Sequence, residues 1–497
     1  MALVAGVDSS TQSCKIVIVD AGTGAEVRRG RASHPEGTEV DPSAWWDALL
    51  AAIEDGGGLH DVDGVSIAAQ QHGMVLLGVD GQVLRPALLW NDTRSAGAAS
   101  DLIDELGSEQ IVRRTGSAPV ASFTVTKVRW VRDAEPDVVP RIAAVALPHD
   151  WLTWRLRGFG PEGESPLGPV LEELTTDRSD ASGTGYWNPA TGDYDLDLFE
   201  LALGRPAREA GSPVDAAPSA GAGARAVILP RILSAGASAG IVHASLAGPS
   251  GHRIVLGPGA GDNAGAALGL GARKGDVVVS LGTSGTVFAV AADPVLDGSG
   301  VVAGFADASG LFLPLVATLN AARALSSVAG LLGVDHDGFS ALAHEADAGS
   351  GGVVLIPYFE GERTPNLPTA NASFHNLTIA STTRENLARA AVEGMLCGLA
   401  DALDAVRAAG VVPRNILLIG GAASNAAVQA VAAQVFDLPV RVPAPGEYVA
   451  RGAAVQAAWV LNGFRPDWAL DSLSDTPSDH RPLIRDQYRA AGAAVRY

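Results

Sequence analysis

Gly257-Pro258-Gly259-Ala260-Gly261-Asp262-Asn263-Ala264-Gly265 follows the apolar run 254–256 near the middle of the 497-residue chain. The glycines permit positive φ and let another molecule come close to the backbone. Asp262 and Asn263 lie where the N-terminal cap of a helix is found, and the alanine-rich segment that continues to Leu270 favours helix. The stretch therefore predicts a strand, a tight glycine turn and the start of a helix. On this pattern alone, Asp262 is either a helix cap or a functional acid at the turn.

The composition is that of a globular protein with more than one domain. At 497 residues, 47% of them hydrophobic and 18% charged, the chain is long enough for two or three domains with substantial cores. Its formal net charge of −20 argues against nucleic acid and anionic membranes as partners. Any phosphate-bearing ligand must then be held by local donors rather than by the overall field.

Cysteine use and the N-terminal sequence both favour a cytoplasmic protein. Cys14 and Cys397 lie in apolar surroundings without pairing or metal-ligand spacing, so we expect buried free thiols in a reducing compartment. Residues 1–7 lack the basic and apolar regions of a signal peptide. No run approaches the roughly 18 apolar residues of a membrane span. We therefore expect a cytoplasmic location and no membrane partner.

Two segments share one pattern, in which two apolar strands flank a turn of small polar residues. Residues 3–8 and 15–20 flank a Ser/Thr/Gln turn, and Asp8 ends the first of these strands. The segment 276–290 repeats the pattern around a Gly-Thr-Ser-Gly turn. Such turns close many hairpins without binding anything, but their free N–H groups and hydroxyls also suit phosphate. The repetition predicts two related domains that face each other.

Polar side chains gather after two consecutive predicted strands of the first half. Gln71 and His72 follow the strand 64–69, and Trp90 and Asn91 open a Trp-Asn-Asp-Thr-Arg segment. A lone histidine in a turn is usually solvated. Amides, an imidazole and an indole at neighbouring strand ends are, however, the mixture that a sugar-binding site requires.

A strand followed by a Gly-Gly turn and a helix occurs at 415–436, with Gly420, Gly421 and Asn425 at the turn. Glycines without side chains let a base or ribose lie on the backbone, so this arrangement suits a nucleotide. Alone it is weak evidence.

Taken together, these segments resemble the FGGY family of sugar kinases, which includes glycerol, glucono-, ribulo- and xylulokinases. The resemblance covers nearly the whole chain, in order. It implies an α/β fold with two ribonuclease-H-like domains, as in the actin-like ATPases, and a catalytic cleft between them. We expect an N-terminal sugar-binding and phosphate-loop domain at 1–247, a C-terminal nucleotide-binding domain at 248–462, and a C-terminal extension at 463–497.

The resemblance also implies roles for individual residues. Asp262 would be the general base, and Asp8 would hold Mg²⁺ beside ATP. The sugar-binding residues would be Gln71, His72, Asp262 and Asn263, supported by Trp90 and Asn91. The nucleotide-binding residues would be Ser10, Thr11, Gln12, Lys15, Gly282, Thr283, Ser284, Gly420, Gly421 and Asn425.

Within the family, the Gln-His-Gly turn, the loop at 177–183 and the chain length most resemble kinases of D-xylulose. One departure is Gln71, where those kinases usually carry methionine. The alternatives are a kinase of another pentulose or a polyol, such as ribulose, ribitol or arabinitol, or an actin-like ATPase without a sugar substrate. A homodimer would fit the family.

Overall fold

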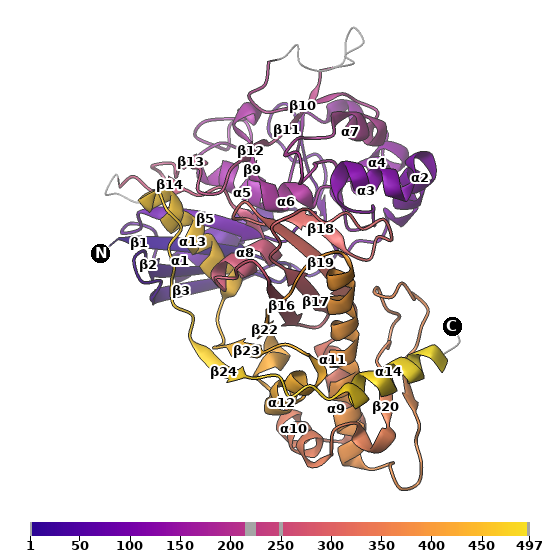
Figure 1. Ribbon diagram of the computed structural model, residues 1–497. Coiled ribbons are helices and arrows are strands. Elements are labelled where there is room, and N and C mark those ends of the chain that lie inside the picture. The colour runs from indigo at the N-terminus through magenta and orange to yellow at the C-terminus, as the bar shows by residue number, and fades with distance from the viewer. Residues whose placement is uncertain (1, 214–224, 248–251, 495–497) are drawn as a thin grey trace.

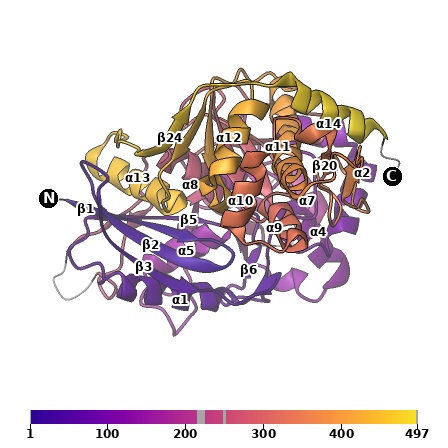
Figure 2. The same cartoon turned by 90° about the horizontal axis from the view of Figure 1, so that it is seen from below.

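Two α/β halves, each built around a seven-stranded sheet, make up the protein. The computed structural model describes residues 2–213, 225–247 and 252–494. Figure 1 shows the indigo-to-magenta N-terminal half above the orange-to-yellow C-terminal half. Viewed from below, β1, β2 and β3 lie on one side and helices α9 to α12 on the other (Figure 2).

The first sheet is built on the predicted N-terminal hairpin. Its strands run in the order β13 (Gly240–Ile241), β14 (Val255–Leu256), β5 (Gly64–Ala69), β1 (Leu3–Ser9), β2 (Ser13–Asp20) and β3 (Glu26–Ser33), with β15 (Ala260–Gly261) also paired to β5. β1 pairs antiparallel with β2 and parallel with β5. The strand β1 is buried along its whole length, as expected for a strand covered on both faces.

Two helices cover opposite faces of this sheet. They are α1 (Pro42–Asp55) and α13 (Tyr448–Asn462). A Cβ at Gly30 in β3 would meet the backbone of α1, and one at Gly6 in β1 would meet the backbone of α13. In β2, Ile16 pairs with Gly30 and the next residue, Val17, pairs with Gly6. Because neighbouring residues of a strand point to opposite faces of the sheet, the two glycines face opposite sides, and so do the helices above them. Both helices therefore approach so closely that only glycine fits beneath them.

The second sheet repeats this plan. Its strands run in the order β18 (Ala303–Ala306), β19 (Phe312–Thr318), β17 (Gly285–Ala289), β16 (Asp276–Leu281), β22 (Asn415–Ile419), β23 (Val440–Pro443) and β24 (Ser472–Thr476). β16 pairs antiparallel with β17 and parallel with β22, as β1 does with β2 and β5. The helices of this half are α9 (Ala322–Leu332), α10 (His336–Glu345), α11 (Arg384–Ala408), α12 (Ala426–Val435) and α14 (Pro482–Ala494).

A further layer in the N-terminal half carries several of the polar segments. Its four-stranded sheet contains β10 (Ala207–Glu209), β11 (Val227–Leu229), β8 (Ala144–Ala146) and β6 (Val75–Leu77). Its helices are α2 (Ala96–Leu106), α3 (Ser108–Thr115), α4 (Thr124–Ala134), α5 (Pro148–Leu156), α6 (Arg178–Ser182) and α7 (Leu196–Leu203). Three strand pairs complete the fold: β4 (Glu39–Val40) with β7 (Ala87–Leu88), β9 (Thr175–Asp177) with β12 (Arg231–Leu233), and β20 (Val354–Ile356) with β21 (Ser373–His375).

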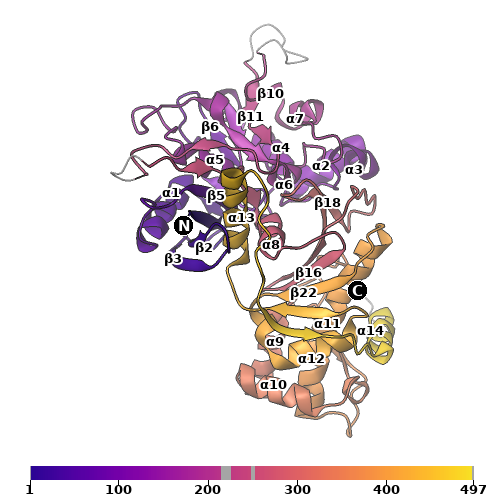
Figure 3. The same cartoon turned by 60° about the vertical axis from the view of Figure 1, so that its left-hand side comes forward.

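The chain passes between the halves more than once. After β23 in the second sheet, α13 packs on β1, β5 and α8 (Asp262–Gly269) of the first half, and β24 then returns to the second sheet. Figure 3 shows α13 and α8 lying side by side between the two sheets. Helix α13 falls inside the segment 248–462 that we assign to the C-terminal domain. The division at 247/248 adjoins residues 248–251, outside the described residues, and stays a prediction.

The expected α/β fold with two domains is confirmed. Cys14 and Cys397 are both buried and free, and burial raises the pKa of each thiol. Among the described helices, none combines the length and the apolar character needed to cross a bilayer.

Candidate active site

A cavity of about 690 Å³ lies between the two halves. Its lining includes eight of the residues that the sequence singled out: Gln71, His72, Trp90, Asp262, Asn263, Gly282, Thr283 and Ser284. The remaining predicted residues are not among those that line it: Asp8, Ser10, Thr11, Gln12, Lys15, Asn91, Gly420, Gly421 and Asn425. Asp262 and Arg363 are the charged side chains among the described lining residues.

Asp262 is the first residue of α8, and the predicted strand, turn and helix are present. The helix cap differs from expectation, because Gly261 occupies the N-cap position and no side chain caps the helix. Asp262 Oδ1 accepts hydrogen bonds from the backbone N–H of Asn263 (2.7 Å) and from Asn263 Nδ2 (2.8 Å). Burial raises the pKa of Asp262 to about 7, against the effect of the Asn263 bonds, and the charge of Asp8 adds to the rise. A carboxylate with a pKa near neutrality suits a general base.

His72 is held as a neutral imidazole. Its Nδ1 lies 2.6 Å from the carbonyl oxygen of Gly183, so Nδ1 carries the proton and donates. Burial lowers the pKa of His72 to about 3, and the charge of Lys127 contributes. The ring packs on Phe123 and Phe305, with centroids 4.9 and 5.8 Å away. Nε2 is therefore a hydrogen-bond acceptor in the cavity wall.

Lys127 stabilises the backbone of the turn that contains His72. Its side chain is fully buried, and Nζ donates to the carbonyl oxygens of His72 (3.1 Å) and Ser122. His72 has a φ of +69°, which is uncommon for a residue with a side chain, and the bond from Lys127 holds its carbonyl group in that conformation.

The turn at residues 9–12, which the sequence predicts to hold phosphate, adjoins the cavity through Trp90, whose Nε1 donates to Thr11 Oγ1 at 2.9 Å. Asp8 is buried at the end of β1, accepts a hydrogen bond from the Ser10 hydroxyl, and lies 3.7 Å from Lys15 Nζ. Burial raises its pKa. Lys15 also forms an ion pair of 2.7 Å with Glu447.

In the second half, the predicted loops lie on neighbouring strands. The Gly282–Ser284 turn joins β16 to β17, and a Cβ at Gly420 would lie 2.5 Å from the carbonyl oxygen of Leu281. Gly420 has a φ of +96°, so both space and backbone geometry require glycine there. Asn425 is the N-cap of α12, where its side chain accepts from the backbone N–H groups of Ala427 and Val428.

Several lining residues were missed by sequence reasoning. Arg363 lies in a polar loop whose sequence indicated no role for it, and Phe123 and Phe305 gave no signal because isolated aromatic residues usually belong to a core. Arg363 has no carboxylate partner among the described residues, and its backbone N–H bonds to Glu362. Glu362 in turn accepts from the Leu319 backbone N–H at 2.6 Å, which fixes this loop to the end of β19.

Two family domains match the chain in order. The N-terminal domain of the FGGY family of carbohydrate kinases matches residues 3–269, and the C-terminal domain matches residues 277–461. The chain belongs to this family. It is a carbohydrate kinase, a transferase that acts on a small sugar and ATP, and both the predicted family and the predicted enzyme class are confirmed.

Relatives of this kinase match it over nearly its full length. The chain is 44% identical to a protein named xylulose kinase from Streptomyces rubiginosus, over 99% of this chain and 98% of that protein. It is also 44% identical to one from Streptomyces coelicolor, over 93% and 88% of the two chains. The crystal structure of xylulose kinase from Bifidobacterium adolescentis is 46% identical and superposes with a TM-score of 0.89 over 99% of each chain.

Proposed function

We propose that this kinase transfers the γ-phosphoryl group of ATP to the terminal hydroxyl of D-xylulose and so forms D-xylulose 5-phosphate. The observation that carries the proposal is Asp262, whose carboxylate lies in the same cavity as the neutral acceptor His72 and the Gly282–Ser284 turn. The names of the relatives that match over nearly the whole chain support D-xylulose as the sugar.

In this proposal Asp262 accepts the proton of the attacking sugar hydroxyl. Phosphoryl transfer requires a base near that hydroxyl and donors that hold the phosphates in line. The raised pKa of Asp262 makes its carboxylate a stronger base than an exposed aspartate, while it stays substantially ionised above neutral pH. Asn263 donates to the carboxylate and orients it.

The other groups bind and orient the two substrates. His72 Nε2 would accept a hydrogen bond from a sugar hydroxyl, because Nδ1 is committed to Gly183. The backbone N–H groups of the Gly282–Ser284 turn would hold ATP phosphates. Arg363 would face the anionic phosphoryl group, since the sugar itself is neutral and Asp262 is the one carboxylate among the described residues of the cavity wall.

Mg²⁺ would be held by Asp8 and by the phosphates. The donor set fits, because Mg²⁺ keeps several waters and takes one or two carboxylates, and Asp8 is a buried carboxylate with a hydroxyl group beside it. When bound, the ion would neutralise charge on the β- and γ-phosphates.

A panel of acceptors tests the proposal. ADP release would be measured with Mg-ATP and D-xylulose, L-xylulose, D-ribulose, L-ribulose, D-arabinitol, xylitol, ribitol, glycerol or gluconate. We expect the highest kcat/KM with D-xylulose. A higher value with another pentulose or polyol would keep the kinase chemistry and reassign the sugar, with Gln71 as the first residue to examine. No sugar-dependent release with any acceptor would contradict the proposed function.

A further inference from the structure

A buried histidine behind the proposed base is enclosed by carboxylates. His149 in α5 is fully buried, and its Nδ1 lies 2.6 Å from Asp180 Oδ2. On the other side of the ring, Nε2 lies 3.2 Å from Asp150 Oδ1, and neither of these two atoms has a hydrogen-bond partner among the described residues. Burial of an ionised side chain is costly unless the charge is paired.

The geometry favours a protonated imidazole over a bound metal ion. Only the imidazolium carries N–H groups on both nitrogens, and carboxylate oxygens lie on both sides of this ring. A neutral ring would turn a lone pair toward one of the two carboxyl groups, which would then have to carry the proton itself. The 2.6 Å separation of Nδ1 and Asp180 is a hydrogen-bond distance that leaves no room for an ion between the two atoms.

The electrostatic surroundings agree with a cation. Burial alone would lower the pKa of His149, but Asp150 and Asp180 raise it to about 9. Burial in turn raises the pKa of both carboxyls, against the effect of His149. The other titratable groups that act on this cluster are Asp177, Tyr186, Tyr194 and Asp262.

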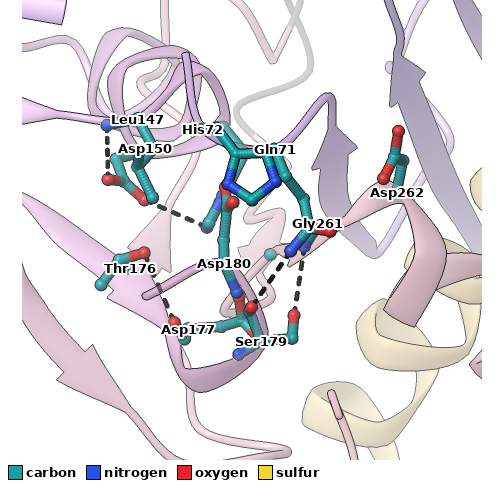
Figure 4. Close-up of polar contacts among 12 residues, drawn as sticks. Gln71, His72, Leu147, Asp150, Thr176, Asp177, Ser179, Asp180, Gly261 and Asp262 are labelled. Atoms are coloured by element: carbon teal, nitrogen blue, oxygen red, sulfur yellow. Dashed lines mark hydrogen bonds and ion pairs between the residues drawn. The ribbon is translucent and has the colours of Figure 1, made fainter. Parts of the chain in front are cut away.

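Helix α6, which carries Asp180, touches the turn that carries the base. The hydroxyl oxygen of Ser179 accepts a hydrogen bond of 3.1 Å from the backbone N–H of Gly261, directly before Asp262. The carbonyl oxygen of Ser179 accepts one of 3.3 Å from Gln71 Nε2. Figure 4 shows Ser179 and Asp180 beside Gly261, with Asp262 next along the chain.

His149 also contacts the turn itself. A Cβ at Gly259 would lie 2.1 Å from the Cδ2 of His149, so the imidazole packs directly on the backbone of the turn. The ring therefore joins three segments: its own helix α5, the helix α6 through Asp180, and the turn before Asp262.

We propose that His149, as a cation paired with Asp150 and Asp180, is a positioning residue that fixes helix α6 against the Gly259–Asp262 turn and so holds Asp262 and Gln71 in place for phosphoryl transfer. The inference rests on the proposed role of Asp262. It assigns His149 no contact with the sugar or with ATP.

Charge and size can be separated by two variants at the same position. His149→Gln removes the cation and keeps a polar side chain of similar size, while His149→Lys keeps a cation. We expect His149→Gln to lower kcat with the best sugar of the panel by about tenfold to a hundredfold, because a small misplacement of a catalytic group costs that much. The KM for ATP should stay near the wild-type value. His149→Lys should recover most of the lost kcat.

A milder variant covers the case in which His149→Gln fails to fold. Ser179→Ala removes the hydroxyl that bonds the Gly261 backbone and the Asp177 carboxylate, and it leaves His149, Asp150 and Asp180 in place. We expect kcat to fall severalfold in a folded protein. Ser95→Ala is the matched control, since Ser95 is equally buried and its hydroxyl bonds to the Ala121 carbonyl oxygen outside this cluster. Thermal denaturation would confirm folding of each variant.

Amide hydrogen exchange of residues 257–265 gives a readout that does not depend on activity. We expect faster exchange in Ser179→Ala and His149→Gln than in wild type and Ser95→Ala. Unchanged kcat and exchange in the folded Ser179→Ala protein would overturn the proposal, as would a folded His149→Lys protein no more active than His149→Gln. A wild-type enzyme silent with every sugar would instead refute the proposed function, and exchange alone would then decide whether His149 orders the turn.

Discussion

At the scale of single residues, the acid dissociation of Asp262 sets the pH dependence that we expect of the reaction rate. As the proposed base, Asp262 must be ionised to accept a proton, and burial raises its pKa to about 7. We therefore expect kcat/KM to decline as the pH falls below about 7, approaching tenfold per unit, in rates measured from pH 5 to 9. Asp262→Asn should lower kcat by about a hundredfold or more at every pH, because it removes the base. A wild-type rate that is flat down to pH 5 would contradict this assignment.

The raised pKa of Asp262 also affects the stability of the fold. Raising the pH favours activity but lowers this group's contribution to stability. The folded protein holds the Asp262 proton at a pH where an unfolded aspartate has lost it, so this group's stabilising contribution is full below about pH 4 and is lost as the pH rises through about 7. Wild type should thus lose stability relative to Asp262→Asn between pH 5 and pH 8. Denaturation midpoints of the two proteins at both pH values supply the comparison.

His72 allows a substitution that preserves the backbone. Asparagine tolerates positive φ better than most residues, so His72→Asn should keep the turn while removing the Nε2 acceptor. We expect the sugar KM to rise about tenfold, the effect of one lost hydrogen bond in a buried site, with little change in the KM for ATP. Initial rates against each substrate test this split. An unchanged sugar KM would return His72 to a structural role.

At the scale of elements, glycines decide how α13 packs on α8. A Cβ at Gly452 in α13 would lie 1.8 Å from the carbonyl oxygen of Gly265 in α8, a backbone atom that cannot rotate away. Gly452→Ala should therefore destabilise the first half by about 1–3 kcal/mol or more in denaturant titrations. Gly330→Ala is the matched control, because Gly330 lies in the helix α9 with open space around it. That variant should gain roughly 0.5–1 kcal/mol from helix propensity.

The sequence predicted local features better than long-range partners. The hairpins around Ser10 and Thr283 and the turn before Asp262 follow from glycines, small polar residues and apolar strands. In each of the three, the residues that give the signal lie close together in the sequence. The return of α13 to the first sheet could not be predicted, because a helix rich in small residues packs equally well on many surfaces. Arg363 was missed because what distinguishes it, a cation facing a cavity from the other half, depends on tertiary structure.

At the scale of the whole molecule, the site is divided between the two halves. The predicted sugar-binding residues come mainly from the first half, and the Gly282–Ser284 turn from the second, yet one cavity is lined by both. A ligand that draws the halves together should prepare the site for the other ligand, and coupling of this kind is reciprocal. The two binding events should therefore be cooperative.

We expect D-xylulose to lower the dissociation constant of a non-hydrolysable ATP analogue, by about fivefold or more if the coupling free energy is near 1 kcal/mol. Titration calorimetry with and without the sugar measures this directly, and the reverse titration must give the same factor. His72→Asn, which we expect to weaken sugar binding without touching the nucleotide side, is the control, and it should need more sugar to produce the same shift. Equal nucleotide affinity at zero and saturating sugar would mean that the two halves bind their ligands independently.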